Sequence, residues 1–218
     1  MKHITLFLFL LLSISTFHSQ QLFLETGSCS SSFDYLNSSS ETLDNLQSKS
    51  QNVMQIGYRS EAIKTFIYYT ITASYTGYGA IGSDPLYGNY MEWDLDYLQL
   101  HAGLDVTAFS FGPNELVLKA NSSFGYLIQG TQVLNNEVFN LVGEEEFNST
   151  LFSLVMGLSV NRVITEDISM YIQFTSGIGD PLGVKRSDLE ERLRLKSKCL
   201  SFGVLMQINK DKSWKNYC

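Results

Sequence analysis

Residues 98–108, with the sequence LQLHAGLDVTA, alternate apolar and polar side chains at every step. The apolar set runs from Leu98 to Ala108 on the even positions, and the polar set between them includes His101 and Asp105. Successive side chains of a β-strand point to opposite faces, so a period of two gives one apolar face and one polar face. The segment therefore predicts a strand whose two sides meet different surroundings.

The same period of two recurs along most of the chain. It is clear in residues 65–75, 168–175 and 200–208, and weaker in residues 22–35, 52–59, 115–129 and 151–164. Together with residues 98–108, these segments predict about eight strands. The fold class expected is therefore all-β.

The connections between the expected strands alternate in length. Residues 60–64, 112–114 and 165–167 make short links, whereas residues 36–51, 76–91, 130–150 and 177–197 make long ones. Short periplasmic turns, long external loops and an even number of strands are typical of outer-membrane barrels. The pattern predicts an antiparallel up-and-down transmembrane β-barrel of about eight strands with both termini on the periplasmic side.

A soluble lipocalin-like barrel is the alternative to a membrane barrel. Such a barrel turns its apolar face inward around an apolar ligand and its polar face toward water. Strand alternation alone does not say which face is inside. We favour the apolar face outward, because the polar face is rich in Ser, Thr, Gln and Gly and carries few charges, unlike a surface in water.

The ends and the composition of the chain indicate where the protein is located. Lys2 and His3 precede an apolar run, residues 4–12, that is too short to span a bilayer and is typical of a signal peptide. We expect residues 1–20 to be the signal and residues 21–218 the barrel domain, exported to the bacterial outer membrane. The formal net charge of −7 argues against nucleic acid as a partner.

Several short motifs resemble those of flavobacterial (Bacteroidota) outer-membrane β-barrel domain proteins. The motifs are Phe23-Leu24-Glu25-Thr26-Gly27, Phe33-Asp34-Tyr35, Gly57-Tyr58-Arg59, Tyr78-Gly79-Ala80, Trp93-Asp94 and Tyr97-Leu98. The resemblance extends along the chain and implies a barrel fold, an outer-membrane location and a Bacteroidota-like source. None of the motifs is catalytic.

The polar face supplies the candidate site residues. Glu25, His101, Asp105 and Lys119 are candidates for a polar cluster in the lumen, because a small barrel fills its interior with hydrogen-bonded side chains. A wider luminal charge network would add Asp94, Asp96, Arg59 and Arg162. The alternative is a lipid-active enzyme centred on His101, which would need a serine and an orienting carboxylate. We favour the structural interpretation and assign no catalytic residue.

The remaining histidine and cysteines bear on metal, cofactor and disulfide chemistry. His101 is the only histidine beyond the signal, and one histidine does not make a metal site, so neither a metal nor a cofactor is expected. Cys29 and Cys199 fall on the first and last strands with their side chains on the polar face. Closure of the barrel would bring them within disulfide range, and free buried thiols are the alternative.

The function expected is a non-enzymatic structural or interaction role in the cell envelope. Outer-membrane lipid is the expected surrounding, and the long loops are the expected contacts with envelope proteins.

Overall fold

The computed structural model describes residues 20–36, 46–63, 66–83, 90–143, 149–181 and 192–209. Of the predicted signal peptide, residues 1–20, only Gln20 lies within these ranges, and Cys218 lies outside them. The strands are β1 (Gln20–Leu36), β2 (Gln47–Ile63), β3 (Ile67–Ser83), β4 (Tyr90–Phe111), β5 (Asn114–Leu134), β6 (Glu137–Asn140), β7 (Thr150–Val163), β8 (Ile168–Pro181) and β9 (Arg192–Asn209). Within the described ranges, no helix is long and apolar enough to cross a membrane.

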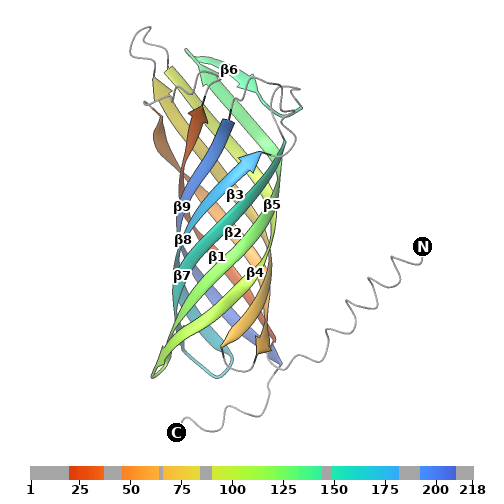
Figure 1. Ribbon diagram of the computed structural model, residues 1–218, viewed down its shortest axis with the longest axis vertical. Coiled ribbons are helices and arrows are strands. Elements are labelled where there is room, and N and C mark those ends of the chain that lie inside the picture. Colours follow the sequence, from red (N-terminus) through yellow and green to blue (C-terminus); the bar gives the residue numbers. More distant parts are fainter. Residues whose placement is uncertain are drawn as a thin grey trace, which may run out of the picture.

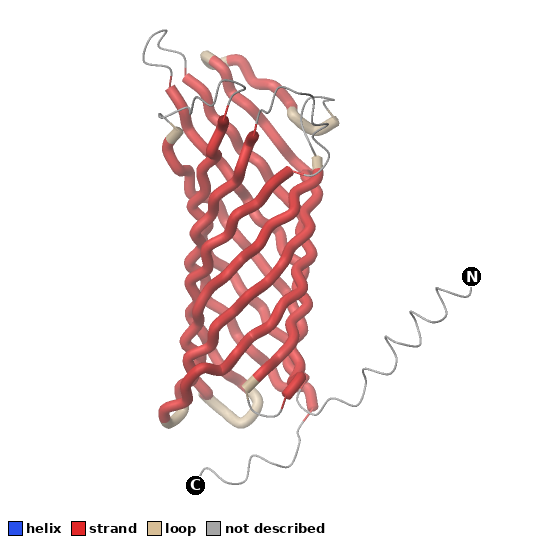
Figure 2. Tube along the Cα trace, in the orientation of Figure 1, coloured by secondary structure: helices blue, strands red, loops and turns tan. Residues whose placement is uncertain are grey.

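Eight of these strands close into a barrel, as the alternation predicts (Figures 1 and 2). Each strand pairs antiparallel with its neighbour along the chain, and β1 pairs with β9 to close the sheet. The short strand β6 pairs with the upper part of β5 and stands at the end of the barrel where β1 ends. β1 begins and β9 ends at the opposite end, where Gln20 lies across from Asn209.

The strand register fixes the tilt of the barrel. A row of paired residues that starts at Phe23 on β1 passes once around the sheet and returns to β1 at Phe33, ten residues further along. The row runs through Gly57, Thr72, His101, Ser123, Ser153, Gly179 and Leu195. A shear of ten in eight strands tilts the strands by roughly 40° and leaves an interior just wide enough for side chains.

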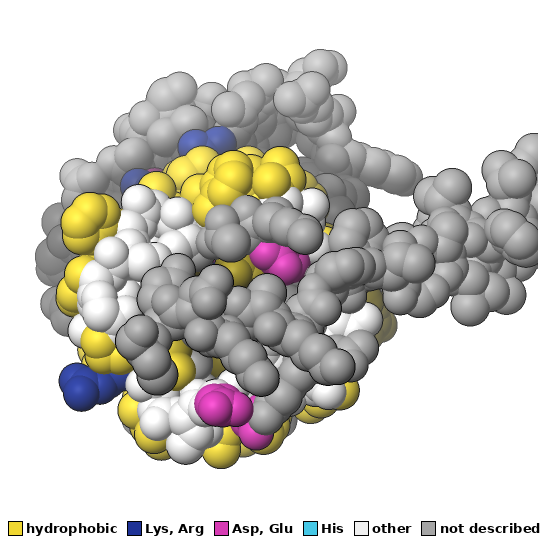
Figure 3. Space-filling view, turned by 90° about the horizontal axis from the view of Figure 1, so that it is seen from below, with side chains coloured by type: hydrophobic (Ala, Val, Ile, Leu, Met, Phe, Trp, Pro, Cys, Tyr) yellow, Lys and Arg dark blue, Asp and Glu magenta, His cyan; other side chains and the backbone are white. Residues whose placement is uncertain are grey.

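The apolar face of the barrel points outward, as expected. Leu100 and Met156 expose 63% and 70% of their surfaces, whereas Gln99 and Ser159, which point inward, are buried. Seen from the end where β1 begins, hydrophobic side chains lie around the outside of the barrel (Figure 3). This arrangement excludes the lipocalin-like alternative, which needs the apolar face inside.

The strands are longer than the alternation predicts. β2 begins at Gln47, β3 continues to Ser83, β4 begins at Tyr90 and β5 continues to Leu134, so much of the predicted long connections is strand. Backbone pairing continues there although the outward side chains are no longer apolar, and the period of two therefore disappears from the sequence. The predicted turns at 112–114 and 165–167 are present as short links.

The β5–β6 hairpin was not predicted. Asn135 and Asn136 connect the two strands, and both have positive φ angles, 50° and 74°. Two successive residues with positive φ make the tight turn that matches the twist of a hairpin, and asparagine tolerates that conformation well. The Asn-Asn pair between two apolar segments was the available signal.

Candidate functional site in the lumen and at the rim

An ion-pair cluster fills the lower part of the lumen. Asp105 on β4 lies between two cations, with its Oδ2 atom 3.1 Å from Arg59 Nε and 3.9 Å from Lys119 Nζ. Arg59 also donates to Gln21 Oε1 at 3.0 Å, and its guanidinium lies 3.7 Å from the centre of the Tyr68 ring. Arg59 and Asp105 are only 3% and 2% exposed, so this pair stays out of water.

Glu25 extends the same network from β1. The Tyr171 hydroxyl donates to Glu25 Oε2 at 2.7 Å, and Gln173 Nε2 donates to Oε1 at 2.6 Å. Lys119 donates to the other side of Gln173 at 2.7 Å, so Gln173 links the glutamate to the lysine. Tyr171 lies directly over Gly203, where any side chain would overlap its ring.

His101 belongs to a separate hydrogen-bonded group. Its Nε2 atom lies 2.8 Å from the Ser74 hydroxyl, which in turn lies 3.2 Å from the hydroxyl of Thr76. Among the described residues, no carboxylate makes a hydrogen bond or ion pair with the His101 ring. Glu25, His101, Asp105 and Lys119 nevertheless line one cavity of about 40 Å³, so all four candidate luminal residues face the same space.

The upper lumen is apolar. Ten buried side chains form one cluster there, and Leu46, Trp93 and Cys199 pack against it. The cluster contains Cys29, Phe33, Tyr78, Ala80, Leu95, Tyr97, Leu127, Leu141, Leu151 and Leu195. Tyr78 donates to Gln99 at 3.2 Å at the boundary with the polar region. The interior therefore consists of an apolar plug above a polar network.

Cys29 and Cys199 are joined as a disulfide in the structure. The two residues are direct partners in the β1–β9 ladder, with their Cα atoms 4.0 Å apart. Cys29 is fully buried against the apolar plug. The bond connects the first and last strands at the closing seam of the barrel, which is the pairing that the parity of the two strands permits.

A bulge in β2 builds a polar cluster on the outer rim. Between Ser48 and Val53, β2 leaves its regular register with β3. Ser31 of β1 replaces β2 as the hydrogen-bond partner of Gly79 on β3. The Ser31 hydroxyl accepts from Gly79 N at 2.7 Å and donates to Gly79 O at 2.9 Å. The serine side chain thus satisfies backbone groups that β2 would otherwise pair.

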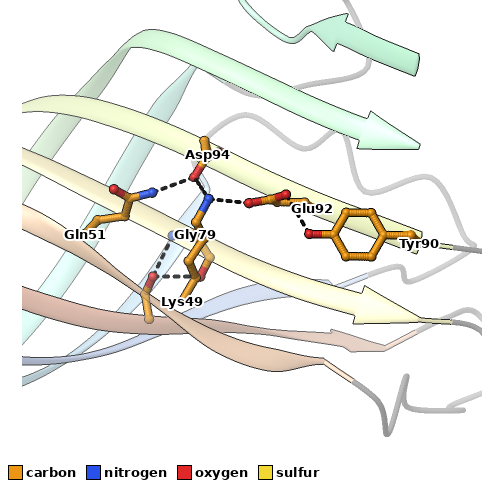
Figure 4. Close-up of polar contacts among 7 residues, drawn as sticks. Lys49, Gln51, Gly79, Tyr90, Glu92 and Asp94 are labelled. Carbon is orange, nitrogen blue, oxygen red and sulfur yellow. Dashed lines mark hydrogen bonds and ion pairs between the residues drawn. The ribbon is translucent and has the colours of Figure 1, made fainter. Parts of the chain in front are cut away.

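The bulge sends two side chains of β2 across the glycines of β3 to β4 (Figure 4). Lys49 Nζ lies 2.5 Å from both Glu92 Oε1 and Asp94 Oδ1, and Gln51 Nε2 donates to Asp94 at 2.5 Å. The Tyr90 hydroxyl donates to Glu92 at 2.7 Å. Gly77 and Gly79 have no side chain to obstruct this crossing, since a Cβ at either position would contact Gln51 or Lys49.

The rim cluster lies beyond the apolar belt, because the outward apolar residues of β4 end at Leu98. Burial acts to lower the pKa of Lys49, but its hydrogen bonds to Asp94 and Glu92 outweigh this effect and raise the pKa above 10.5. The hydrogen bonds from Lys49 and Tyr90 lower the pKa of Glu92 below 4.5. Both pKa shifts mean that the charged forms of Lys49 and Glu92 are favoured.

Three members of the wider predicted charge network are wrong. Asp94 and Asp96 were expected in the lumen, but both have the outward parity of Leu98 on β4, and Asp94 takes part in the rim cluster on the outside. Arg162 was also expected in the lumen, but it is exposed on β7. Lys49, Gln51 and Glu92 were missed because bulges break strand parity, and no signal in the sequence marks this bulge.

The described part of the chain does not bring metal ligands together. Among the described residues, no group of three or more His, Cys, Asp or Glu side chains is placed to hold a metal ion. In the polar lumen, Asp105 instead pairs with Arg59 and Lys119, and Glu25 accepts hydrogen bonds from Tyr171 and Gln173.

Comparison with known proteins gives the fold. No protein-family model matches the sequence, and no curated protein matches it. Among solved structures, Neisserial surface protein A has a TM-score of 0.50 at 10% identity, with 86% of this chain and 97% of that chain covered. The outer membrane protein OprG of Pseudomonas aeruginosa has a TM-score of 0.49 at 8% identity, with 89% and 98% covered. At 10% identity, the likeness to Neisserial surface protein A shows that the chain shares the small closed barrel fold.

Proposed function

We propose that this chain is a bacterial outer-membrane barrel with a non-enzymatic role in envelope structure or in contacts with envelope partners. The carrying observation is the combination of an apolar outer belt with a filled interior. On β7 every outward side chain from Phe152 to Val160 is apolar. A transmembrane barrel needs an outward apolar belt about 25 Å tall. Strands suit this environment because every backbone group in a closed barrel is paired.

The filled interior supports a structural role over transport. Buried aromatic and leucine side chains occupy the upper lumen, and the Arg59–Asp105 pair with Lys119 occupies the lower lumen. The luminal cavity of about 40 Å³ has room for a few ordered waters and not for a solute. A structural or interaction protein has no need of an open lumen.

The test of location is extraction of the native protein from its membrane. We expect the protein to remain in the membrane pellet after an alkaline carbonate wash and to enter solution with detergent. Its mobility on a gel should shift when it is boiled, because a folded barrel resists the detergent. Recovery in the soluble periplasmic extract without detergent would contradict the proposal. The Bacteroidota-like source belongs to the same proposal and is supported only by the sequence motifs.

A lipid-active enzyme is the second candidate, and the Ser74–His101 contact of 2.8 Å favours it. A serine beside a histidine can act as nucleophile and base, although a third group normally orients the base. Ser74 is buried and also bonds to Thr76, which supports the structural role. Lipid profiles of cells with wild type, His101→Ala and Ser74→Ala should be identical. A lipid species present with wild type and absent with both variants would establish the enzyme.

A further inference from the structure

A column of cations interrupts the outward face of β9. Below this column, Leu200 and Phe202 point outward and are exposed, as the apolar belt requires. Above them, Lys198, Lys196 and Arg194 take the successive outward positions, and all three are exposed. The belt on β9 therefore ends at Leu200.

The belt ends lower on β9 than on the opposite side of the barrel. With a shear of ten, a row of paired residues climbs by about 1.25 residues per strand. The row through Lys198 includes Met156 on β7 and Ala120 on β5. When this climb is subtracted, Lys198 lies at the same height along the barrel axis as Leu154 and Phe124. These two residues belong to the apolar belt and are 57% and 49% exposed. Lys198 thus lies at a depth where other strands present large apolar side chains.

The neighbours of Lys198 widen this gap in the belt. Ser176 on β8 and Ser30 on β1 are its direct partners in the two adjoining ladders. Ser30 is followed by Ser32, the partner of Lys196. We call Ser30, Ser176, Lys196 and Lys198 the seam notch, because the Cys29–Cys199 disulfide joins the same two strands directly beside it.

Among the described residues, the two upper cations of the column have carboxylate partners and the lowest has none. Arg194 Nε lies 3.1 Å from Asp180, and Lys196 forms an ion pair with Asp34. Lys198 has no carboxylate partner among the described residues. A cation at the margin of the hydrocarbon layer is costly unless an anion meets it.

We propose that the seam notch binds the phosphate group of an anionic lipid in the outer leaflet. The lysine stem lies along the apolar surface beside Leu200, and its ammonium reaches up to the level where lipid headgroups begin. Ser30 and Ser176 lie beside Lys198 in the two adjoining ladders, and their hydroxyls can donate to phosphate oxygens. Acyl chains would then lie over the exposed Leu200 and Phe202. The inference rests on the proposed membrane location.

Native mass spectrometry of the full-length barrel in detergent tests the notch, with lipid A and its dephosphorylated form as probes. We expect wild type to retain lipid A in preference to the dephosphorylated form. Lys198→Gln should weaken lipid A binding about fivefold, and Lys198→Arg should preserve it. Arg162→Gln is the matched control, because it removes an exposed outward cation near the other end of the barrel and should leave binding unchanged.

Three outcomes would overturn the seam notch. These are equal retention of the two lipids, unchanged binding in Lys198→Gln, or an equal loss in Arg162→Gln. Boiling each variant before electrophoresis shows whether it is a folded barrel. A wild type that fails to insert into lipid bilayers contradicts the proposed membrane location, whereas an inserted barrel that ignores the phosphate contradicts only the notch.

Discussion

Asp105 is the residue on which the lower lumen depends. It is the carboxylate that faces both Arg59 and Lys119, and it is almost fully buried. Strand parity in residues 98–108 correctly predicts that its side chain points inward. Parity does not predict its partners, because Arg59 and Lys119 come from β2 and β5 and meet Asp105 only through the register of the closed sheet.

Replacement of Asp105 by asparagine should strongly destabilise the barrel. The variant leaves the Arg59 guanidinium buried without a counter-charge, and breaking a buried pair in this way typically costs about 3–5 kcal/mol. Urea unfolding of the refolded barrel, followed by tryptophan fluorescence, measures the change in free energy. Asp34→Asn is the matched control, because its pair with Lys196 is exposed and should contribute less than about 1 kcal/mol. Similar losses of unfolding free energy in the two variants would show that Asp105 does not form an ion pair shielded from water.

At the scale of the elements, β2 shows how a local irregularity creates a site. Its bulge turns Lys49 and Gln51 toward the acids of β4, and Ser31 fills the gap left beside Gly79. The alternation in residues 52–59 predicts the regular part of the strand. It ends where the bulge begins, because a bulge changes the face to which the following side chains point.

The rim cluster should titrate as a linked pair. We expect the Glu92 carboxyl in the folded barrel to titrate below 4.5 and to return toward 4.5 in Lys49→Gln. The stabilisation from this depressed pKa is present above pH 4.5 and is lost as the pH falls through the folded value. Carbon-detected NMR of the Glu92 side chain in micelles gives the two midpoints. Identical midpoints in wild type and variant would contradict the pairing with Lys49.

The closing seam between β1 and β9 should be held covalently. Mass spectrometry of the exported protein without reductant should find Cys29 and Cys199 in one linked peptide, with no free thiol at either position. The free energy of unfolding of the double variant Cys29→Ser/Cys199→Ser should be about 2–5 kcal/mol lower than that of wild type, since the bond closes a loop of 170 residues. Detection of both free thiols in the exported protein would contradict the bond, and the reduced wild type serves as the control.

At the scale of the whole molecule, the barrel is a closed and filled cylinder. The apolar plug of the upper lumen and the ion pairs of the lower lumen leave room for little more than ordered water. The outer face joins two different surfaces, with an apolar belt around most of the circumference and the seam notch at β9 and β1. Both properties arise from strands far apart in the sequence.

The purified barrel should not conduct ions in planar bilayers. The expected result is a current equal to that of the lipid bilayer alone across the usual range of voltages, because the described side chains of the apolar plug fill the upper lumen. A water-filled porin added to the same bilayer verifies that the system detects channels. Reproducible single-channel steps from the folded protein would contradict the filled interior.

The sequence by itself determined the number of strands in the barrel wall, their antiparallel order, the short turns and the faces of the regular segments. It could do so because side-chain alternation and turn residues are local properties of the chain. The position of the Arg59–Asp105–Lys119 cluster, the rim cluster around Lys49 and the depth of Lys198 were decided only by the tertiary structure. These features depend on the shear of the closed barrel and on one bulge, which bring together residues from separate strands without leaving a periodic signal in any of them.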